Sequence, residues 1–122
     1  MSENDFKVAP IKPEITPADL EKLDIRVGTI AAVEEVAGSD KLVKLVVNFG
    51  DRQRTILAGM KQERANPKQI EGKQALFVVN LPPRKMMGQI SEGMLFDIGF
   101  ADGITPCLAV PEHETPDGAR AG

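Results

Sequence analysis

The chain has 122 residues, enough for one domain with a single core. Apolar residues make up 42% and charged residues 27%, which argues against both disorder and a membrane-embedded class. No apolar run approaches the roughly 18 residues of a spanning helix, and the first residues lack a secretory signal pattern. We therefore expect a cytoplasmic protein with no membrane partner. One cysteine excludes an internal disulfide, and we interpret Cys107 as a small buried side chain.

The charge is unevenly distributed along the chain. The net charge is −3, yet residues 1–24 and 111–122 alone contribute −3 and −2. Residues 41–88 contain ten bases and three acids, a net charge of +7. Binding to phosphates depends on the local field, so this excess is compatible with nucleic acid. The same bases could also form an ordinary solvated surface.

The predicted elements begin after a proline-containing arm, residues 1–15. A cap at Thr16, followed by Pro17 and Asp19, predicts a short helix over about 17–23. Alternation over 25–33 predicts a long strand that bends at Gly28. Turn residues, β-branched runs and a capped helical turn then predict further elements: strands 42–49 and 53–58, a helical turn over 66–72, a strand over 74–80, a basic loop over 81–90, and strands 93–100 and 104–110.

Three strands, a short helix and two more strands is the order of an OB-fold, a five-stranded Greek-key barrel. An SH3-type barrel is the main alternative, and the helix between the third and fourth strands favours the OB type. The prediction is an all-β protein with short helices and terminal extensions: an arm over 1–15 and a barrel domain with a C-terminal extension over 16–122.

Motifs for catalysis, cofactors and metal ions are absent from the sequence. It contains no phosphate-binding loop, dinucleotide glycine pattern or nucleophile elbow. The single histidine, His113, lies in an acidic segment without an oriented partner. We therefore expect neither an enzyme nor a bound cofactor.

The most informative segment is 80–95. Pro82 and Pro83 stiffen the backbone before Arg84 and Lys85, which lowers the entropy lost on gripping phosphate. Three methionines add adaptable apolar surface, and two polar residues offer donors and acceptors: Met86, Met87, Met94, Asn80 and Ser91. In the alternative interpretation, the methionines fill a barrel end and Asn80 ties down a turn.

Four blocks of the sequence occur in a characteristic order. The blocks are Leu23-Asp24-Ile25-Arg26-Val27-Gly28, Ser39-Asp40-Lys41-Leu42, Asn80-Leu81 followed by Pro83-Arg84-Lys85-Met86, and Ser91-Glu92-Gly93-Met94. They resemble the tRNA-binding domain, which occurs in small bacterial proteins of the CsaA type, at the C-terminus of bacterial methionyl-tRNA synthetases and in eukaryotic synthetase-associated factors. The resemblance runs from about Thr16 to the C-terminus.

The resemblance implies an OB barrel, a tRNA ligand and a homodimer whose terminal extensions build the interface. One departure is visible, because Met87 stands where the family often has another base. The RNA contacts that the resemblance implies are Lys41, Asn80, Arg84, Lys85, Met87, Ser91 and Met94. Since the chain has no Trp or Tyr, we expect it to bind RNA through charge and shape more than through base stacking.

Two classes of function stay open on the sequence. The first is a homodimeric, non-catalytic protein that selects tRNA by its structure. The second is a protein-interaction module or export-related chaperone of the CsaA type that binds unfolded clients through methionine-rich apolar surface. A third possibility is a docking factor that delivers tRNA to an aminoacyl-tRNA synthetase.

Overall fold

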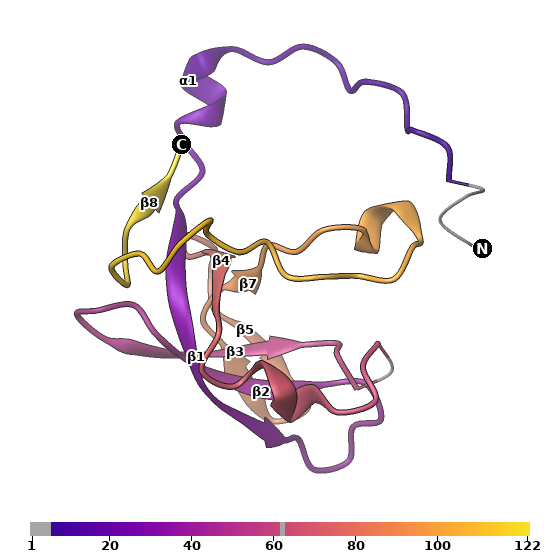
Figure 1. The fold of residues 1–122 in the computed structure, drawn as a ribbon, viewed down its shortest axis with the longest axis vertical. Helices are drawn as coiled ribbons and strands as arrows, with labels where there is room; N and C mark the ends of the chain where they lie inside the picture. Colours follow the sequence, from indigo (N-terminus) through magenta and orange to yellow (C-terminus); the bar gives the residue numbers. More distant parts are fainter. Residues whose placement is uncertain (1–5, 62) are drawn as a thin grey trace.

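The computed structural model describes residues 6–61 and 63–122, which form a small β-barrel with short helical turns (Figure 1). The elements in chain order are α1 (Pro17–Leu20), β1 (Ile25–Glu35), β2 (Val43–Asn48), β3 (Gln53–Ala58), η2 (Pro67–Ile70), β4 (Gln74–Val78), β5 (Arg84–Met86), β6 (Gln89–Ser91), β7 (Met94–Leu95), η3 (Phe100–Asp102) and β8 (Arg120–Ala121).

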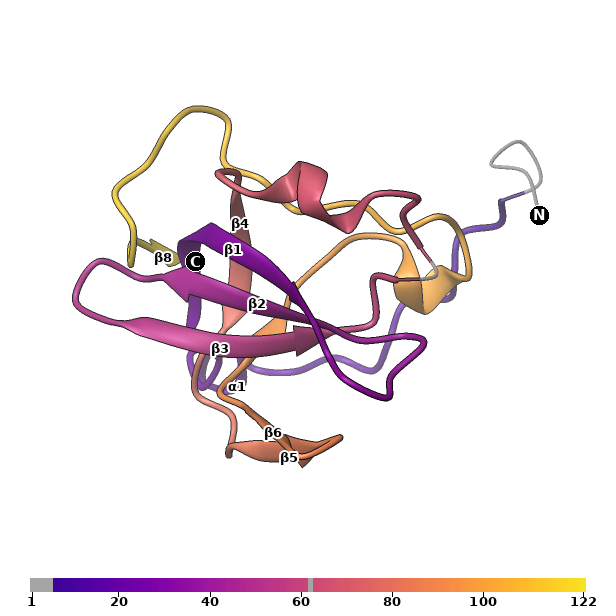
Figure 2. The ribbon, with the colours of Figure 1, turned by 90° about the horizontal axis from the view of Figure 1, so that it is seen from below.

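The main sheet is antiparallel and curls on itself. Its order is β3-β2-β1-β4-β7, with β8 added beside β1, whereas β5 and β6 form a separate two-stranded sheet (Figure 2). The two edges of the curl meet where Glu92 donates its backbone N–H to the carbonyl oxygen of Thr55 in β3, at 2.8 Å. This closure leaves few exposed edges and confirms the predicted all-β barrel of the OB type.

The long strand β1 serves both halves of the barrel. Its first part, Ile25 to Thr29, pairs with β4, and Thr29 to Glu35 pairs with β2. A β-bulge between Ile30 and Ala32 bends the strand, as bulges do. Gly28 has a steric role, because a Cβ there would lie 2.5 Å from Val47 Cγ1. The predicted bend is confirmed, although the bulge lies just after Gly28.

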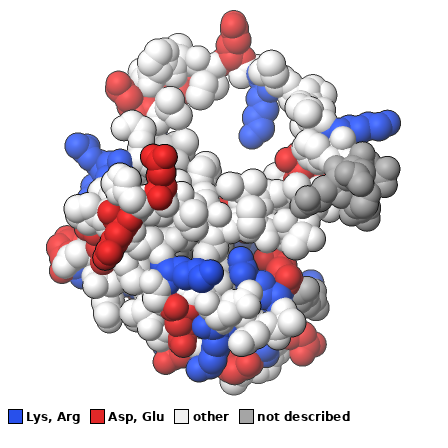
Figure 3. Space-filling model, viewed as in Figure 1, with Lys and Arg blue, Asp and Glu red and all other residues white. Residues whose placement is uncertain are grey.

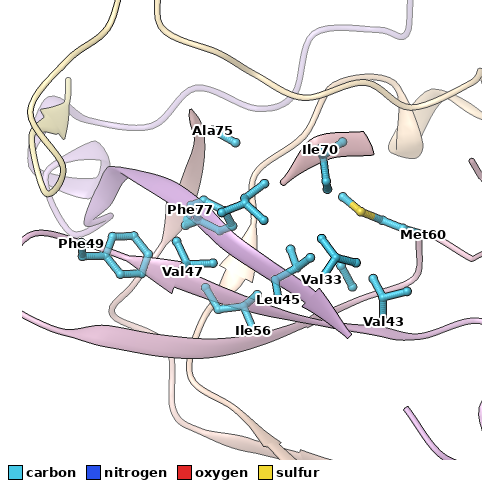
Figure 4. Close-up of a cluster of buried hydrophobic side chains, with 12 residues drawn as sticks. Val33, Val43, Leu45, Val47, Phe49, Ile56, Met60, Ile70, Ala75 and Phe77 are labelled. Atoms are coloured by element: carbon cyan, nitrogen blue, oxygen red, sulfur yellow. The ribbon is translucent and has the colours of Figure 1, made fainter. Parts of the chain in front are cut away.

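The core fills the inside of the curled sheet. Alternate residues of β2 point inward, so Val43, Leu45 and Val47 are buried while the residues between them are half-buried. Phe49 and Phe77 meet edge to face, with ring centroids 5.6 Å apart. Ile70, from η2, and Met60 cover one end of the barrel (Figure 4).

Two short helical segments begin where caps predict them. Thr16 accepts a hydrogen bond from the Asp19 N–H, and Asp19 accepts one from the Thr16 N–H, so both halves of a capping box are present. Asn66 caps η2 by accepting from the Lys68 N–H. The helix α1 ends at Leu20, three residues before its predicted end.

Three details of the sequence prediction are wrong. The chain over 81–90 is a hairpin, not a loop. The predicted strands over 93–100 and 104–110 are reduced to β7 and one bridge between Ile98 and Cys107, because η3 and the left-handed glycines that flank it, Gly99 and Gly103, interrupt the extended chain. Cys107 is exposed rather than buried, because the adjacent Leu108 packs against the core and successive residues of an extended segment point to opposite sides.

The two ends of the chain behave differently. Residues 7–15 of the arm have no regular structure and are exposed along their length, whereas residues 1–5 of the predicted arm lie outside the described residues. The C-terminal segment is held against the barrel, because Gly118 donates to the Val27 carbonyl and Thr29 donates to the Asp117 carboxylate. Among the described residues, no helix is long and apolar enough to span a membrane.

Candidate RNA-binding surface

The basic segment forms a tight hairpin that projects from the barrel. In this hairpin β5 and β6 pair antiparallel from Arg84 with Ser91 to Met86 with Gln89. Met87 and Gly88 form its two-residue turn with φ angles of 50° and 77°. Two positive φ values in succession match the type I′ turn that suits the strand twist of short hairpins. The hairpin therefore presents its cations from an ordered backbone.

The base of the hairpin is fixed to β3. Ser91 is 4% exposed, and its hydroxyl accepts from the Leu57 N–H at 3.0 Å and donates to the Gly93 carbonyl at 3.0 Å. Arg54 bridges the two segments that lead into and out of the hairpin, because it donates to the carbonyl oxygens of Val79 (2.8 Å) and Glu92 (3.2 Å). These bonds set where the hairpin stands on the barrel.

Asn80 joins the end of β4 to the segment that leads into β1. Its amide nitrogen donates to the Lys22 carbonyl at 2.7 Å, and its amide oxygen accepts from the Asp24 N–H at 3.0 Å. Both ends of the side chain are thus bonded within the protein. This matches the alternative considered on the sequence, in which Asn80 ties down a turn.

The three cations among the predicted RNA contacts, Lys41, Arg84 and Lys85, are exposed. None of the three has an ion-pair partner among the described residues. Successive strand residues point to opposite faces, so Arg84 shares a face with its cross-strand partner Ser91, and Lys85 shares the other face with Ile90. The hairpin therefore carries one free cation on each face.

The loop between β1 and β2 lies beside the hairpin. A Cβ built on Gly38 would lie 3.5 Å from the Met87 Cε, so the tip of the hairpin contacts this loop. Ser39 orders the loop by accepting from the N–H groups of Lys41 and Leu42, and Lys61 donates to the Ser39 carbonyl. The fold thus brings Lys41 and the hairpin residues, which lie more than 40 positions apart in sequence, onto one surface.

Apolar side chains accompany these cations. Met87 is 54% exposed and Met94 is 52% exposed, and Ile90 lies between them in sequence with a similar exposure. The four exposed residues Lys41, Arg84, Lys85 and Met87 define what we call the hairpin surface. Met94, in β7, pairs with Val78 and lies at the hairpin's base. The described residues contain no group of His, Cys, Asp and Glu side chains suited to a metal ion.

The sequence prediction missed the contribution of Arg54. An arginine in a β-strand has the same pattern as any half-exposed cation, so nothing local marks it as the residue that holds the hairpin base. Its partners are two backbone carbonyls, at Val79 and Glu92, whose positions follow from tertiary pairing.

The fold and surface together define a small barrel that presents cations from an ordered hairpin, a class suited to nucleic acid. Residues 25–120 match the family described as "Putative tRNA binding domain", and the chain belongs to that family.

Curated relatives include methionine–tRNA ligases. Those of Nitrosomonas europaea and Porphyromonas gingivalis are 38% identical over 113 residues and 44% identical over 114 residues. Each alignment covers 93% of this chain and 16% of the ligase, so the chain spans about a sixth of these relatives.

Solved structures of similar size share the fold. A protein of Pyrococcus horikoshii, described as related to methionyl-tRNA synthetase, superposes with a TM-score of 0.81 at 35% identity, over 90% of this chain and 100% of that one. The CsaA chaperone of Bacillus anthracis superposes with a TM-score of 0.77 at 28% identity, with the same coverage. The predicted resemblance to the synthetase domain and to CsaA is confirmed.

Proposed function

We propose that this protein is a non-catalytic, structure-selective tRNA-binding protein that uses the hairpin surface. The observation that carries the proposal is the ordered hairpin with its free cations, Arg84 and Lys85, beside Lys41. A cation whose backbone is already ordered loses less entropy on binding phosphate. Membership of the tRNA-binding family supports tRNA as the ligand and the cytoplasm as its location.

Direct RNA contacts are proposed for the exposed members of the predicted set. Lys41, Arg84 and Lys85 bind phosphate oxygens, while Met87 and Met94 cover sugar or base surfaces. A direct contact from Asn80 or Ser91 stays a prediction. The hydrogen bonds of these two side chains within the protein support a positioning role, in which they hold the hairpin where the RNA meets it.

Selection by shape rather than by base stacking follows from the small number of aromatic side chains. Phe49 and Phe77 are buried in the core, and the chain has no Trp or Tyr. Cations on both faces of a projecting hairpin suit a folded RNA that presents phosphates from more than one direction. Binding of this kind weakens steeply as salt rises.

The proposal of a homodimer rests on apolar side chains that are exposed to solvent in a single chain. Ile11 in the arm is 98% exposed, and Phe100 in the C-terminal extension is 69% exposed. In Figure 3 the arm arches away from the barrel and leaves an open gap. Further exposed apolar residues lie in the same two parts of the chain: Val8 and Ile15 in the arm, and Phe96, Ile98 and Val110 in the segment around Phe100. A second copy would bury this surface, and two barrels would span one L-shaped tRNA.

A chaperone or protein-interaction function is the second candidate. The exposed methionines and the similarity to structures described as CsaA chaperones favour it. Similarity to methionine–tRNA ligases favours a third role, a factor that works with a synthetase in trans. Both roles are compatible with tRNA binding if they use different surfaces.

A salt titration tests the tRNA proposal. The affinity for tRNA is compared with that for an RNA duplex of equal length, and equal affinity at low salt would refute structure selectivity. Arg84→Ala with Lys85→Ala is expected to weaken tRNA binding and to lower the slope of log K against log salt by about two, near one per phosphate contact. Lys68→Ala, an exposed cation in η2 outside the hairpin surface, is the matched control.

The double variant also separates the candidate functions. If it loses tRNA binding and still suppresses aggregation of an unfolded client, the two activities use different surfaces. For the dimer, sedimentation of the whole chain at micromolar concentration is expected to give twice the mass of one chain. A monomer at that concentration would contradict the dimer.

A further inference from the structure

A second cationic feature lies at the base of the hairpin, away from its tip. A pocket of about 280 Å³ opens between the start of β1, the β2–β3 turn and the end of β4. Arg26, Arg52 and Arg54 line it together with Asn80, and Phe49 and Val79 supply an apolar wall. We call it the arginine pocket. Its three arginines come from separate places in the sequence and meet through the fold.

The guanidinium groups keep donors available for a ligand. Arg54 uses Nη1 for both of its bonds to carbonyl oxygens, and no described residue accepts from its Nε or Nη2. Arg26 binds the Asp24 carboxylate through Nε (2.8 Å) and Nη2 (3.1 Å), which leaves Nη1. Arg52 is exposed and lies 3.5 Å from the Asp51 carboxylate. A planar guanidinium group can bind two oxygens of one phosphate through parallel hydrogen bonds, so these arginines suit a phosphate ligand.

The charges around the pocket favour an anion. Two carboxylates, those of Asp24 and Asp51, face its three arginines. A fourth arginine, Arg120, lies next to Arg26 across the β1–β8 pairing. The hydrogen bond from Arg26 lowers the pKa of Asp24, so this carboxylate stays ionised and holds the Arg26 guanidinium in place at neutral pH.

We propose that the arginine pocket binds a single nucleotide, with its phosphate on Arg52 and Arg54 and its base or ribose against Val79. Phe49 lines the pocket but is only 5% exposed, so it offers no ring face for stacking. An apolar wall beside convergent polar groups is the usual form of a small-ligand site. A guanidinium plane also stacks on bases, which compensates for the scarcity of aromatic residues.

The pocket lies near the base of the hairpin, because Arg54 in the pocket donates to the Glu92 carbonyl oxygen next to Ser91. Arg54 in the pocket and Leu57, whose N–H binds Ser91 of the hairpin, lie three residues apart on β3, about 10 Å at the usual strand rise. Neighbouring nucleotides of one RNA chain can therefore occupy both places. The assignment of the nucleotide to a bound tRNA rests on the proposed function, whereas binding of a free nucleotide does not.

A nucleotide titration of the full chain, followed by backbone amide NMR, tests the pocket. Adenosine 5′-monophosphate is expected to shift the amides of Asp51, Arg52 and Asn80, and adenosine alone to shift them much less. Arg52→Ala is expected to weaken binding of the monophosphate roughly tenfold, as loss of a charge-assisted hydrogen bond predicts. Its exposed side chain makes it a safe change for folding. Lys68→Ala is expected to bind as the unchanged protein does.

Three results would overturn the pocket assignment. The first is an absence of amide shifts at the pocket with millimolar monophosphate. The second is equal binding by the monophosphate and adenosine, unaffected by Arg52→Ala. The third is stronger binding of tetraglutamate, which would assign the pocket to an acidic peptide. Because the titration uses no tRNA, a protein that binds the monophosphate here but binds no tRNA would refute the proposed function and leave the pocket standing.

Discussion

Replacing Ser91 with alanine tests whether the hairpin is fixed by this buried hydroxyl. The change leaves the Leu57 N–H without its acceptor and the Gly93 carbonyl without its donor, at a site where Ser91 is 4% exposed. A buried polar group without a partner costs about 1–3 kcal/mol. We take about 2 kcal/mol for the pair, since the carbonyl oxygen tolerates loss of one bond better than the N–H does.

The expected loss is large enough to measure by thermal unfolding. For a chain of this length, about 2 kcal/mol lowers Tm by roughly 8 °C. Calorimetry gives the midpoint, and hydrogen exchange at the Leu57 amide should become faster in the variant. Ser39→Ala is the matched control, because Ser39 accepts from two N–H groups in a loop where water can replace it. It is expected to cost about 0.5–1 kcal/mol.

The result that would refute this reasoning is specific. If Ser91→Ala unfolds within about 2 °C of the unchanged protein, well inside the shift expected from the lost bonds, the hydroxyl does not fix the hairpin. If in addition tRNA affinity falls tenfold, Ser91 contacts the RNA directly, as the family resemblance implies. A stability loss with a much smaller affinity loss supports the positioning role.

Two further changes test the barrel closure and a half-buried acid, Asp97. Gly93→Ala is expected to lower the free energy of unfolding by about 2 kcal/mol or more, because φ is +149° and the new Cβ would lie 2.8 Å from the Val78 carbonyl oxygen. Urea unfolding measures this loss. Gly59, where a Cβ would meet open space, is the control, and an equal loss in Gly59→Ala would contradict the reasoning. Burial raises the pKa of Asp97, and burial followed by the Asp97 charge raises that of Glu63. The folded state thus disfavours ionised Asp97, so Asp97→Asn should raise Tm at pH 7, and this gain should vanish below the unfolded pKa, near pH 4. An equal gain at pH 3 would show that charge is not the cause.

Local sequence signals predicted the strands in which apolar residues alternate along the strand. In β2 the inward residues Val43, Leu45 and Val47 alternate with half-buried ones, so the strand and its buried face follow from the sequence. The cap at Thr16 is equally local. In the C-terminal part of the chain the turn at η3 interrupts the extended backbone, so the strands predicted over 93–100 and 104–110 are reduced to β7 and one bridge.

The candidate site was predicted in its residues more than in its geometry. The cations Arg84 and Lys85 stand out in the sequence because two prolines precede them, and both are exposed. The hairpin that carries them was missed. Its turn is Met87-Gly88 rather than the Asn-Gly pair that marks type I′ turns, and each of its strands has three residues, too few for a periodic signal.

The sequence by itself determined the barrel class, the family and the position of the basic segment, because strand alternation, caps and charge are properties of neighbouring residues. Tertiary structure decided which side chains are exposed and which bond within the protein. Asn80 and Ser91 turned out to bond within the protein, and Arg26, Arg52 and Arg54 came together at one pocket. Such contacts join residues from different strands, and the register of closure that places them is set by packing across the whole barrel.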